Sequence, residues 1–148
     1  MRASARLTLL VITIVMGACS NAIPPTAPTA MLVDAGAPPA PGSGVLGAFV
    51  GVGHQGRGSV RFNVQNGVGR LDFSSDFSVS GVPGPYVYLN TTNNANTGKP
   101  LRVAALKSND GAQTYSFQLP PNVSYTFVLI WCDPFNVPVA EAPIAPTP

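Results

Sequence analysis

The sequence predicts an all-β fold: a single antiparallel β-sandwich or barrel-like domain of about 8 short strands, within residues 45–140. Two observations predict this class. Several short runs alternate apolar and polar residues, and this period of two puts one face of a strand in a core. Clusters of glycine, proline and asparagine separate the runs, and no stretch shows helical periodicity. About 95 residues are enough for such a domain to fold alone.

The alternation is clearest in SVRFNVQ (residues 59–65) and YSFQL (residues 115–119), where every second residue is apolar. Residues at that spacing lie on one face of an extended chain, so both segments are predicted to be half-buried strands. Similar short runs of strand-forming residues occur at 45–50, 69–73, 77–80, 86–89, 101–106, 125–131 and 137–140.

The segments between these runs have the composition of turns. QNG, GVPG and SNDG combine residues that accept or preset the backbone angles of a tight turn. The longest loop, residues 90–100, is polar, and it is expected to be a mobile excursion at one end of the sandwich.

The N-terminus has the pattern of an export signal. Arg2 and Arg6 precede the apolar run LTLLVITIVMGA, which ends in small residues just before Cys19. The run is too short for a transmembrane helix, which needs roughly 20 residues, so residues 1–18 are predicted to be a signal peptide.

The last residues of the signal, MGAC, resemble the bacterial lipobox, in which the cysteine is acylated and becomes the mature N-terminus. That resemblance implies a lipoprotein that is exported and anchored to a bacterial membrane through Cys19, because two or more acyl chains give stable anchoring. The alternative is cleavage by an ordinary signal peptidase nearby, which would leave Cys19 incidental.

Two proline-rich segments flank the predicted domain. Residues 19–44 are expected to be the lipidated cysteine and an extended Pro/Ala-rich tether that lifts the domain off the membrane, since this stretch contains six prolines and almost no charge. Residues 141–148, EAPIAPTP, are expected to be a disordered tail.

Charge argues against a nucleic-acid partner. After removal of the signal, six basic and six acidic residues remain, so the mature chain has a formal net charge of zero. Nucleic-acid-binding domains carry a basic excess on one face. The membrane, reached through the lipid anchor, is the one partner that the sequence identifies, and any redox or protein partner is unknown.

Cys132 is the first candidate for chemistry. If Cys19 is acylated, Cys132 is the single free thiol of an exported protein, which suggests a reactive or intermolecular role. Its strand suggests the opposite, because residues 127–132 are apolar on both faces and would bury an inert thiol. Neither Trp131 nor Asp133 would activate it, since a reactive thiolate needs positive charge nearby. Both interpretations stay open.

His54 is the second candidate, as the single histidine of the chain, in the glycine-rich turn GVGHQGRG. A loop histidine can act as a ligand or an acid-base group, or it can simply be solvated. A blue-copper site shared with Cys132 would need a second histidine, and a structural zinc site fails for the same shortage of ligands. The sequence therefore predicts no metal site and leaves any cofactor unknown.

The carboxylates offer no hydrolytic site. Asp72, Asp76, Asp110 and Asp133 could supply acids or bases, but no motif places a nucleophile beside one of them. Asp72 and Asp76, in DFSSDF, are expected to flank a bend rather than share a strand face.

Five segments taken in order resemble the DM-thirteen domain, which is also described as an electron-transfer domain. The resemblance covers about residues 45–144 and is carried by Phe49 and His54, the pair Phe73 and Phe77, the Gly84-Pro85 turn, Gly111 and Tyr115, and Trp131-Cys132 followed by Phe135.

The resemblance implies that Cys132 is the redox residue, because the matching cysteine of that family is the one proposed to do redox work. It also implies a small secreted protein or lipoprotein when the host is bacterial. Two positions depart from the family pattern: Tyr86 replaces an acidic residue, and Asp133 stands where a basic residue is common. A non-catalytic β-sandwich that binds a ligand or partner, with Cys132 as core packing and the loop at residues 90–98 as its contact surface, is the alternative.

Overall fold

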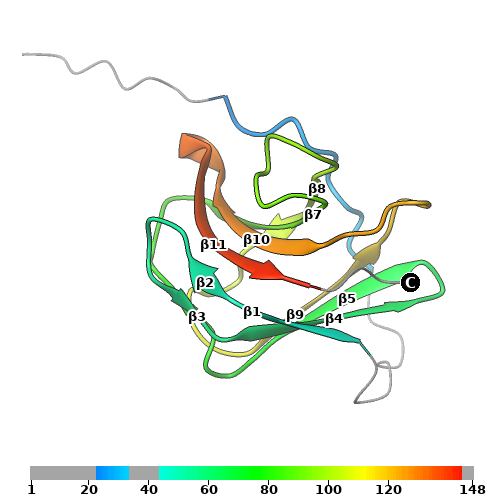
Figure 1. Cartoon of the computed structure of the whole chain (residues 1–148), viewed down its shortest axis with the longest axis horizontal. Coiled ribbons are helices and arrows are strands. Elements are labelled where there is room, and N and C mark those ends of the chain that lie inside the picture. The colour runs from blue at the N-terminus through cyan, green and yellow to red at the C-terminus, as the bar shows by residue number, and fades with distance from the viewer. Residues whose placement is uncertain (1–22, 34–43, 145–148) are drawn as a thin grey trace, which may run out of the picture.

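Two antiparallel sheets pack face to face in the computed structural model, which describes residues 23–33 and 44–144 (Figure 1). One sheet has the order β1 (Val45–Ala48), β4 (Ser59–Gln65), β5 (Val68–Phe73) and β9 (Gln113–Gln118). The other has the order β2 (Val50–Gly51), β11 (Val137–Pro143), β10 (Phe127–Cys132), β7 (Pro85–Asn90) and β8 (Leu101–Ala105). A short ribbon pairs β3 (Gly56–Arg57) with β6 (Ser78–Val79).

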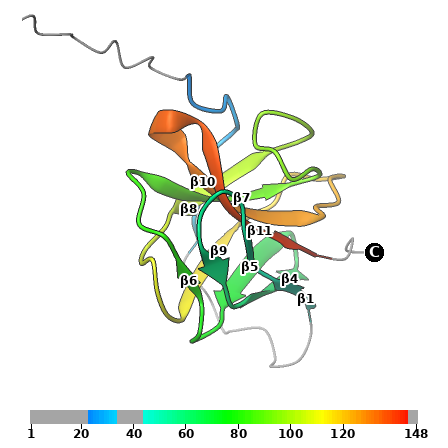
Figure 2. The ribbon, with the colours of Figure 1, turned by 60° about the vertical axis from the view of Figure 1, so that its left-hand side comes forward.

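The predicted fold class is confirmed. All named strand pairs are antiparallel, and the two layers are seen apart in Figure 2. Within the described residues the helical content is one 3-10 turn, η1 (Asp133–Phe135). The alternation in β4 works as predicted, since Val60 and Phe62 are buried and Arg61 between them is not.

The β4–β5 hairpin shows how the turn residues set the strand register. Gln65 pairs with Val68, which leaves Asn66 and Gly67 as a two-residue loop. Both have positive φ, 53° and 76°, as a type I′ turn requires. Asparagine and glycine adopt this conformation most easily, so QNG fixes which residues of the two strands face the core.

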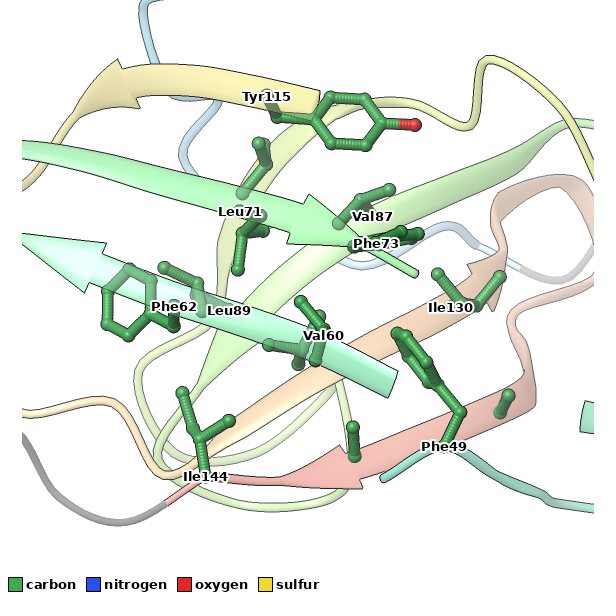
Figure 3. Packing of buried hydrophobic residues seen from close by; sticks show 14 of the residues in the cluster. Phe49, Val60, Phe62, Leu71, Phe73, Val87, Leu89, Tyr115, Ile130 and Ile144 are labelled. Carbon is green, nitrogen blue, oxygen red and sulfur yellow. The ribbon is translucent and has the colours of Figure 1, made fainter. Parts of the chain in front are cut away.

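The core lies between the sheets (Figure 3). Phe62 and Leu71 point inward from one sheet, and Leu89 and Ile130 from the other. Each of the four is at most 1% exposed. Burying a side chain of this kind contributes roughly 1.5–3 kcal/mol, so the inward-facing residues of both sheets contribute strongly to stability.

Four aromatic rings close one end of the core. Phe49, Phe73 and Phe77 lie with ring centroids 4.7 to 5.1 Å apart, and Tyr115 lies 5.5 Å from Phe73. Their tilted and edge-on arrangements are the favourable ones for aromatic pairs. Phe49 sits between β1 and β2, so this cluster fixes the chain where it crosses from one sheet to the other.

The folded part extends beyond the boundary expected at Ala140. Strand β11 continues to Pro143, and Ile144 is only 4% exposed and donates its backbone N–H to the Thr126 carbonyl at 2.8 Å. The alternation of β11 explains this, because Ala140, Ala142 and Ile144 all have buried side chains. Of the expected tail, residues 141–144 are therefore part of the domain, and residues 145–148 lie outside the described residues.

The first described segment, residues 23–33, lies against the domain, and we call it the N-terminal strap (blue in Figure 1). Next to β8 the Ala30 N–H donates to the Arg102 carbonyl at 2.7 Å, and the Arg102 N–H donates to the Pro28 carbonyl at 2.8 Å. Leu32 then bridges to Phe117 in β9. This part of the expected tether is docked on the domain rather than free.

The strap docks there because β8 and β9 are the last strands of their sheets. Edge strands have unpaired N–H and C=O groups that need a partner. The strap supplies that partner to one edge strand of each sheet and so links the two layers along one side of the sandwich.

Candidate functional site

Cys132 is the last residue of β10, the strand between β7 and β11. Its side chain belongs to the main core with Val128 and Ile130, while Leu129 and Trp131 point to the opposite face and a second, smaller apolar cluster. The two apolar faces predicted for this strand are thus both buried.

The Cys132 thiol is shielded from solvent. The residue is 1% exposed, and Sγ donates a hydrogen bond to the Pro83 carbonyl at 3.1 Å. A thiol in this position packs as a small apolar group and cannot be reached by a second thiol without local opening. Among the described residues it is the one free cysteine.

Directly after Cys132 the chain turns through η1, which presents Asp133 at the end of the sheet. Asn136 ends this turn with φ 51° and donates its N–H to the Asp133 carbonyl, and its side chain accepts the Trp131 indole N–H at 3.0 Å. Because the turn is fixed from both sides, the position of the Asp133 carboxylate is also fixed.

Asp133 is the centre of a polar network at the end of the sandwich. The residue is 7% exposed; its Oδ1 accepts the Tyr88 hydroxyl and its Oδ2 accepts Arg102 Nε, both at 2.8 Å. The Arg102 guanidinium lies over the Tyr86 ring, with Cζ 3.3 Å from the centroid. A buried carboxylate is tolerated here because a cation and a hydroxyl both satisfy it.

The network raises the pKa values of both Tyr88 and Arg102. Burial raises the pKa of the Tyr88 hydroxyl, and its hydrogen bond to Asp133 raises this pKa further. For Arg102, burial acts to lower the pKa, but the ion pair with Asp133 outweighs burial and raises it. Tyr88 is therefore neutral and Arg102 charged throughout the physiological range.

A groove of about 760 Å³ lies beside this network. One wall is the strap, residues 24–29, and the other is formed by Gly84, Tyr86, Arg102, Asp133 and Pro134. This size is typical of a small-molecule site. The Cys132 thiol does not line the groove, but Gly84 and Asp133, which do, directly follow Pro83, its acceptor, and Cys132 itself.

His54 lies apart from this arrangement. It is exposed in the turn between β2 and β3, and its side chain has no hydrogen bond or ion pair within the described part of the chain. Residues 23–33 and 44–144 contain no group of three His, Cys, Asp or Glu side chains that could hold a metal ion. Within the described residues no hydrogen bond joins His54 to Cys132, and His54 does not line the groove.

The other carboxylates do not form a catalytic pair. Asp72, in β5, is paired with Arg70 at 2.8 Å and accepts the Thr114 hydroxyl at 2.7 Å. Burial acts to raise the pKa of Asp72, but these two hydrogen bonds outweigh it and lower the pKa. Asp76 follows the end of β5 in an exposed turn, so the two residues do flank a bend.

The loop after β7, expected to be mobile, is held by its own hydrogen bonds. The Asn90 side chain is fully buried, and its Nδ2 donates to the carbonyls of Asn94 and Thr97 at 2.7 and 3.0 Å. Its Oδ1 accepts the Thr91 N–H. An asparagine bonded to its own loop in this way ties the loop to the end of β7.

Cys19 and the predicted signal peptide lie outside the described residues. In the described part no helix is long and apolar enough to cross a membrane.

The fold and this site define a small antiparallel β-sandwich with one buried thiol beside a groove at its end. The model of the family "Electron transfer DM13" matches residues 48–144, which is about two thirds of the chain. The chain therefore belongs to the DM13 electron-transfer family, as the sequence resemblance predicted. Searches of the curated proteins and of the solved structures found no match.

Sequence reasoning missed the network and the groove. Arg102 and Tyr88 each belong to a predicted strand, and nothing in the sequence marks either as a partner of Asp133. The signal that pointed to Asp133 was its position after Cys132 in an otherwise apolar run, but its partners are Tyr88 in β7 and Arg102 in β8, 45 and 31 residues away. The proline-rich strap was interpreted as a free tether because composition does not show which sheet edges lack a partner.

Proposed function

We propose that this chain is an exported, lipid-anchored electron-transfer module in which Cys132 is the redox residue. Membership of the DM13 family supports the class of function. The observation that carries the assignment to Cys132 is that its thiol is bonded to the Pro83 carbonyl, and that Gly84 and Asp133, the residues directly after these two, line a groove wide enough for a small molecule. Its role and its partner remain part of the proposal.

The envelope location rests on the sequence. LTLLVITIVMGA followed by Cys19 has the order of a lipoprotein signal, and acylation of Cys19 would anchor the domain to a bacterial membrane. Acylation also removes Cys19 as a disulfide partner. If Cys132 takes part in a redox reaction, its reaction partner is then a bound group or another molecule.

Burial of the thiol determines the kind of redox reaction that fits. Thiol–disulfide exchange requires direct attack at sulfur, which a 1% exposed residue does not allow in the closed structure. Electron exchange with a group bound in the groove needs no such contact at sulfur; in that reaction the thiol would give up an electron and its Sγ proton, and the bound group would take up both. Gly84 and Asp133, which line the groove, directly follow Pro83 and Cys132 in the chain.

The test compares redox titrations of wild-type protein and Cys132→Ser, purified from a bacterial envelope, with absorption spectra recorded in oxidised and reduced states. Wild-type protein is expected to exchange electrons reversibly, and Cys132→Ser is expected to lose this exchange. Val128→Ala is the matched control, because Val128 lies on the same buried face of β10 and its truncation perturbs the same core. Equal electron exchange in wild type and Cys132→Ser, at equal fold stability, would refute the redox role.

A binding module is the second candidate, favoured by the complete burial of Cys132 within the core. In that case the ordered loop of residues 90–98 presents the contact surface. Capture of an envelope partner that survives Cys132→Ser but is lost when the loop is shortened would support this function. Capture lost with Cys132→Ser and kept after loop shortening would exclude it.

A further inference from the structure

The groove between the strap and the end of the sandwich is a built site with a defined chemical character. Its charged lining residues are Arg102 and Asp133, and they are paired with each other, so the groove has no net charge. The strap wall consists of Pro24, Pro25, Thr26, Ala27, Pro28 and Thr29. A neutral, mainly apolar groove favours a neutral ligand and disfavours an anion or a cation.

The Arg102 side chain is the group in this groove that can stack on a ligand and donate hydrogen bonds to it. Its guanidinium is held flat over the Tyr86 ring by the bond from Nε to Asp133, at 2.8 Å. A fixed guanidinium plane can stack on a second aromatic ring, and arginine has further N–H donors on its two Nη atoms. A planar ring with carbonyl acceptors fits both features.

The strap also limits how far the groove can lie from a membrane anchor. If Cys19 is acylated, five peptide units join it to Pro24, the first groove residue, and they span at most about 18 Å. A free tether over all of residues 19–44 would instead reach about 90 Å. Docking of the strap therefore keeps the groove close to the bilayer surface, within reach of lipid-soluble molecules.

We propose that the groove binds a neutral, planar, conjugated cyclic dicarbonyl of the quinone class, stacked on Arg102 and taken from the membrane. This inference rests on the proposed function, because a lipid-soluble quinone would be the electron partner of an anchored module. The groove has the volume for one ring with a short substituent. Paired with Asp133, Arg102 does not offer the unbalanced positive charge that an anionic lipid headgroup requires.

The test is a titration of the protein from residue 19 onward, with Cys19→Ser to prevent acylation, followed by amide and Arg102 Nε–H NMR signals. Duroquinone is the probe, since its fully substituted ring does not add thiols. Saturable shifts are expected at Tyr86, Arg102 and Thr29. Cyclohexane-1,4-dione has the carbonyls without the planar conjugated ring and is expected to bind at least tenfold more weakly. Shifts that are absent up to the solubility limit, or that lie elsewhere, would overturn the proposal.

Two variants and one control sharpen the result. Thr26→Trp places a bulky ring in the groove from an exposed strap position, and Arg102→Gln removes the stacking plane; each is expected to weaken binding at least tenfold. Arg57→Gln is the control, because Arg57 is an exposed arginine of β3 and does not line this groove. Binding that is unaffected by Thr26→Trp in a folded protein would overturn the site.

The competing occupant and the parent proposal are tested separately. Dihexanoyl phosphatidylglycerol shifting the same signals at lower concentration than duroquinone would assign the groove to a lipid headgroup and refute the inference. Cys132→Ser is expected to keep duroquinone binding, because the thiol does not line the groove. Electron exchange without quinone binding refutes this inference alone, and quinone binding without electron exchange refutes the redox role of Cys132 alone.

Discussion

At the scale of single residues, Asp133 determines the character of the site. Its carboxylate joins Tyr88 from β7 to Arg102 from β8, and it holds the guanidinium over Tyr86. Sequence reasoning considered Asp133 as a residue that leaves the neighbouring thiol without activation. In the structure the carboxylate accepts hydrogen bonds from Tyr88 and Arg102. Its main effect is therefore to hold the Arg102 guanidinium in place beside the groove.

We expect Tyr88→Phe to lower the free energy of unfolding by about 1–3 kcal/mol, because it removes a buried hydrogen bond to a charged group. Urea unfolding at neutral pH measures the effect. Tyr125→Phe is the matched control: Tyr125 is equally buried, but its hydroxyl makes no hydrogen bond to another described residue. Equal losses in the two variants would show that the Asp133 network adds no stability.

Buried tyrosines predict the alkaline limit of stability. Burial raises the pKa of Tyr115 to about 12, although the Lys107 backbone N–H acts to lower it, and burial raises the pKa of Tyr125 to about 12. In the unfolded chain both ionise near 10. The contribution of these two neutral hydroxyls to the free energy of unfolding is therefore fully present below pH 10. It is lost as the pH rises to about 12.

Unfolding free energies measured by urea between pH 9 and 12 should fall with pH, and the fall should be smaller in Tyr115→Phe. The slopes are compared rather than the absolute values, because Tyr115→Phe also removes hydrogen bonds to Gln113 and Lys107. An unchanged slope in the variant would mean that Tyr115 ionises at its ordinary pKa in the folded protein.

At the scale of elements, the strap shows that part of the predicted N-terminal tether is bound to the domain. It pairs with β8 at Arg102 and with β9 at Phe117, the edge strands of the two sheets. Without it, both edges would present unpaired backbone groups. The same segment forms one wall of the groove, so edge protection and site formation depend on one set of hydrogen bonds.

Proline substitutions test the docking of the strap. Ala30→Pro removes the N–H that donates to the Arg102 carbonyl, so the strap should detach locally. Hydrogen exchange at the Arg102 amide, which donates to Pro28, should then become at least about tenfold faster.

Met31→Pro is the matched control for this prediction. Met31 is 72% exposed, and its N–H has no acceptor among the described residues, so its replacement should leave the Arg102 amide protected. Equal exchange rates in Ala30→Pro and wild type would mean that the strap is not docked in solution.

At the scale of the whole molecule, the arrangement brings three features to one end. The Asp133 network and the strap line the groove, and Cys132 directly precedes Asp133, while His54 lies in a separate exposed turn. Since the strap begins a few residues after Cys19, an acylated chain would hold this end near the bilayer.

Membrane association is the prediction at this scale. Expressed in a bacterial host, the full chain is expected in the membrane fraction and Cys19→Ser in the soluble fraction, because the acyl chains supply the anchoring energy. Cys132→Ser is the control and should fractionate like wild type, since its thiol is buried. Cys19→Ser protein that stays with the membrane would contradict lipid anchoring through Cys19.

The sequence by itself determined the fold class and most strands, because alternation and turn residues are local signals that the structure obeys directly. It also determined the two buried faces of β10 and the family. Only the tertiary structure decided that Cys132 is shielded, that Asp133 pairs with Arg102, that residues 141–144 belong to β11 and the core, and that the strap is docked. Each of these depends on partners distant in the chain. The composition of a segment does not show whether an edge strand elsewhere in the chain has unpaired backbone groups with which the segment can pair.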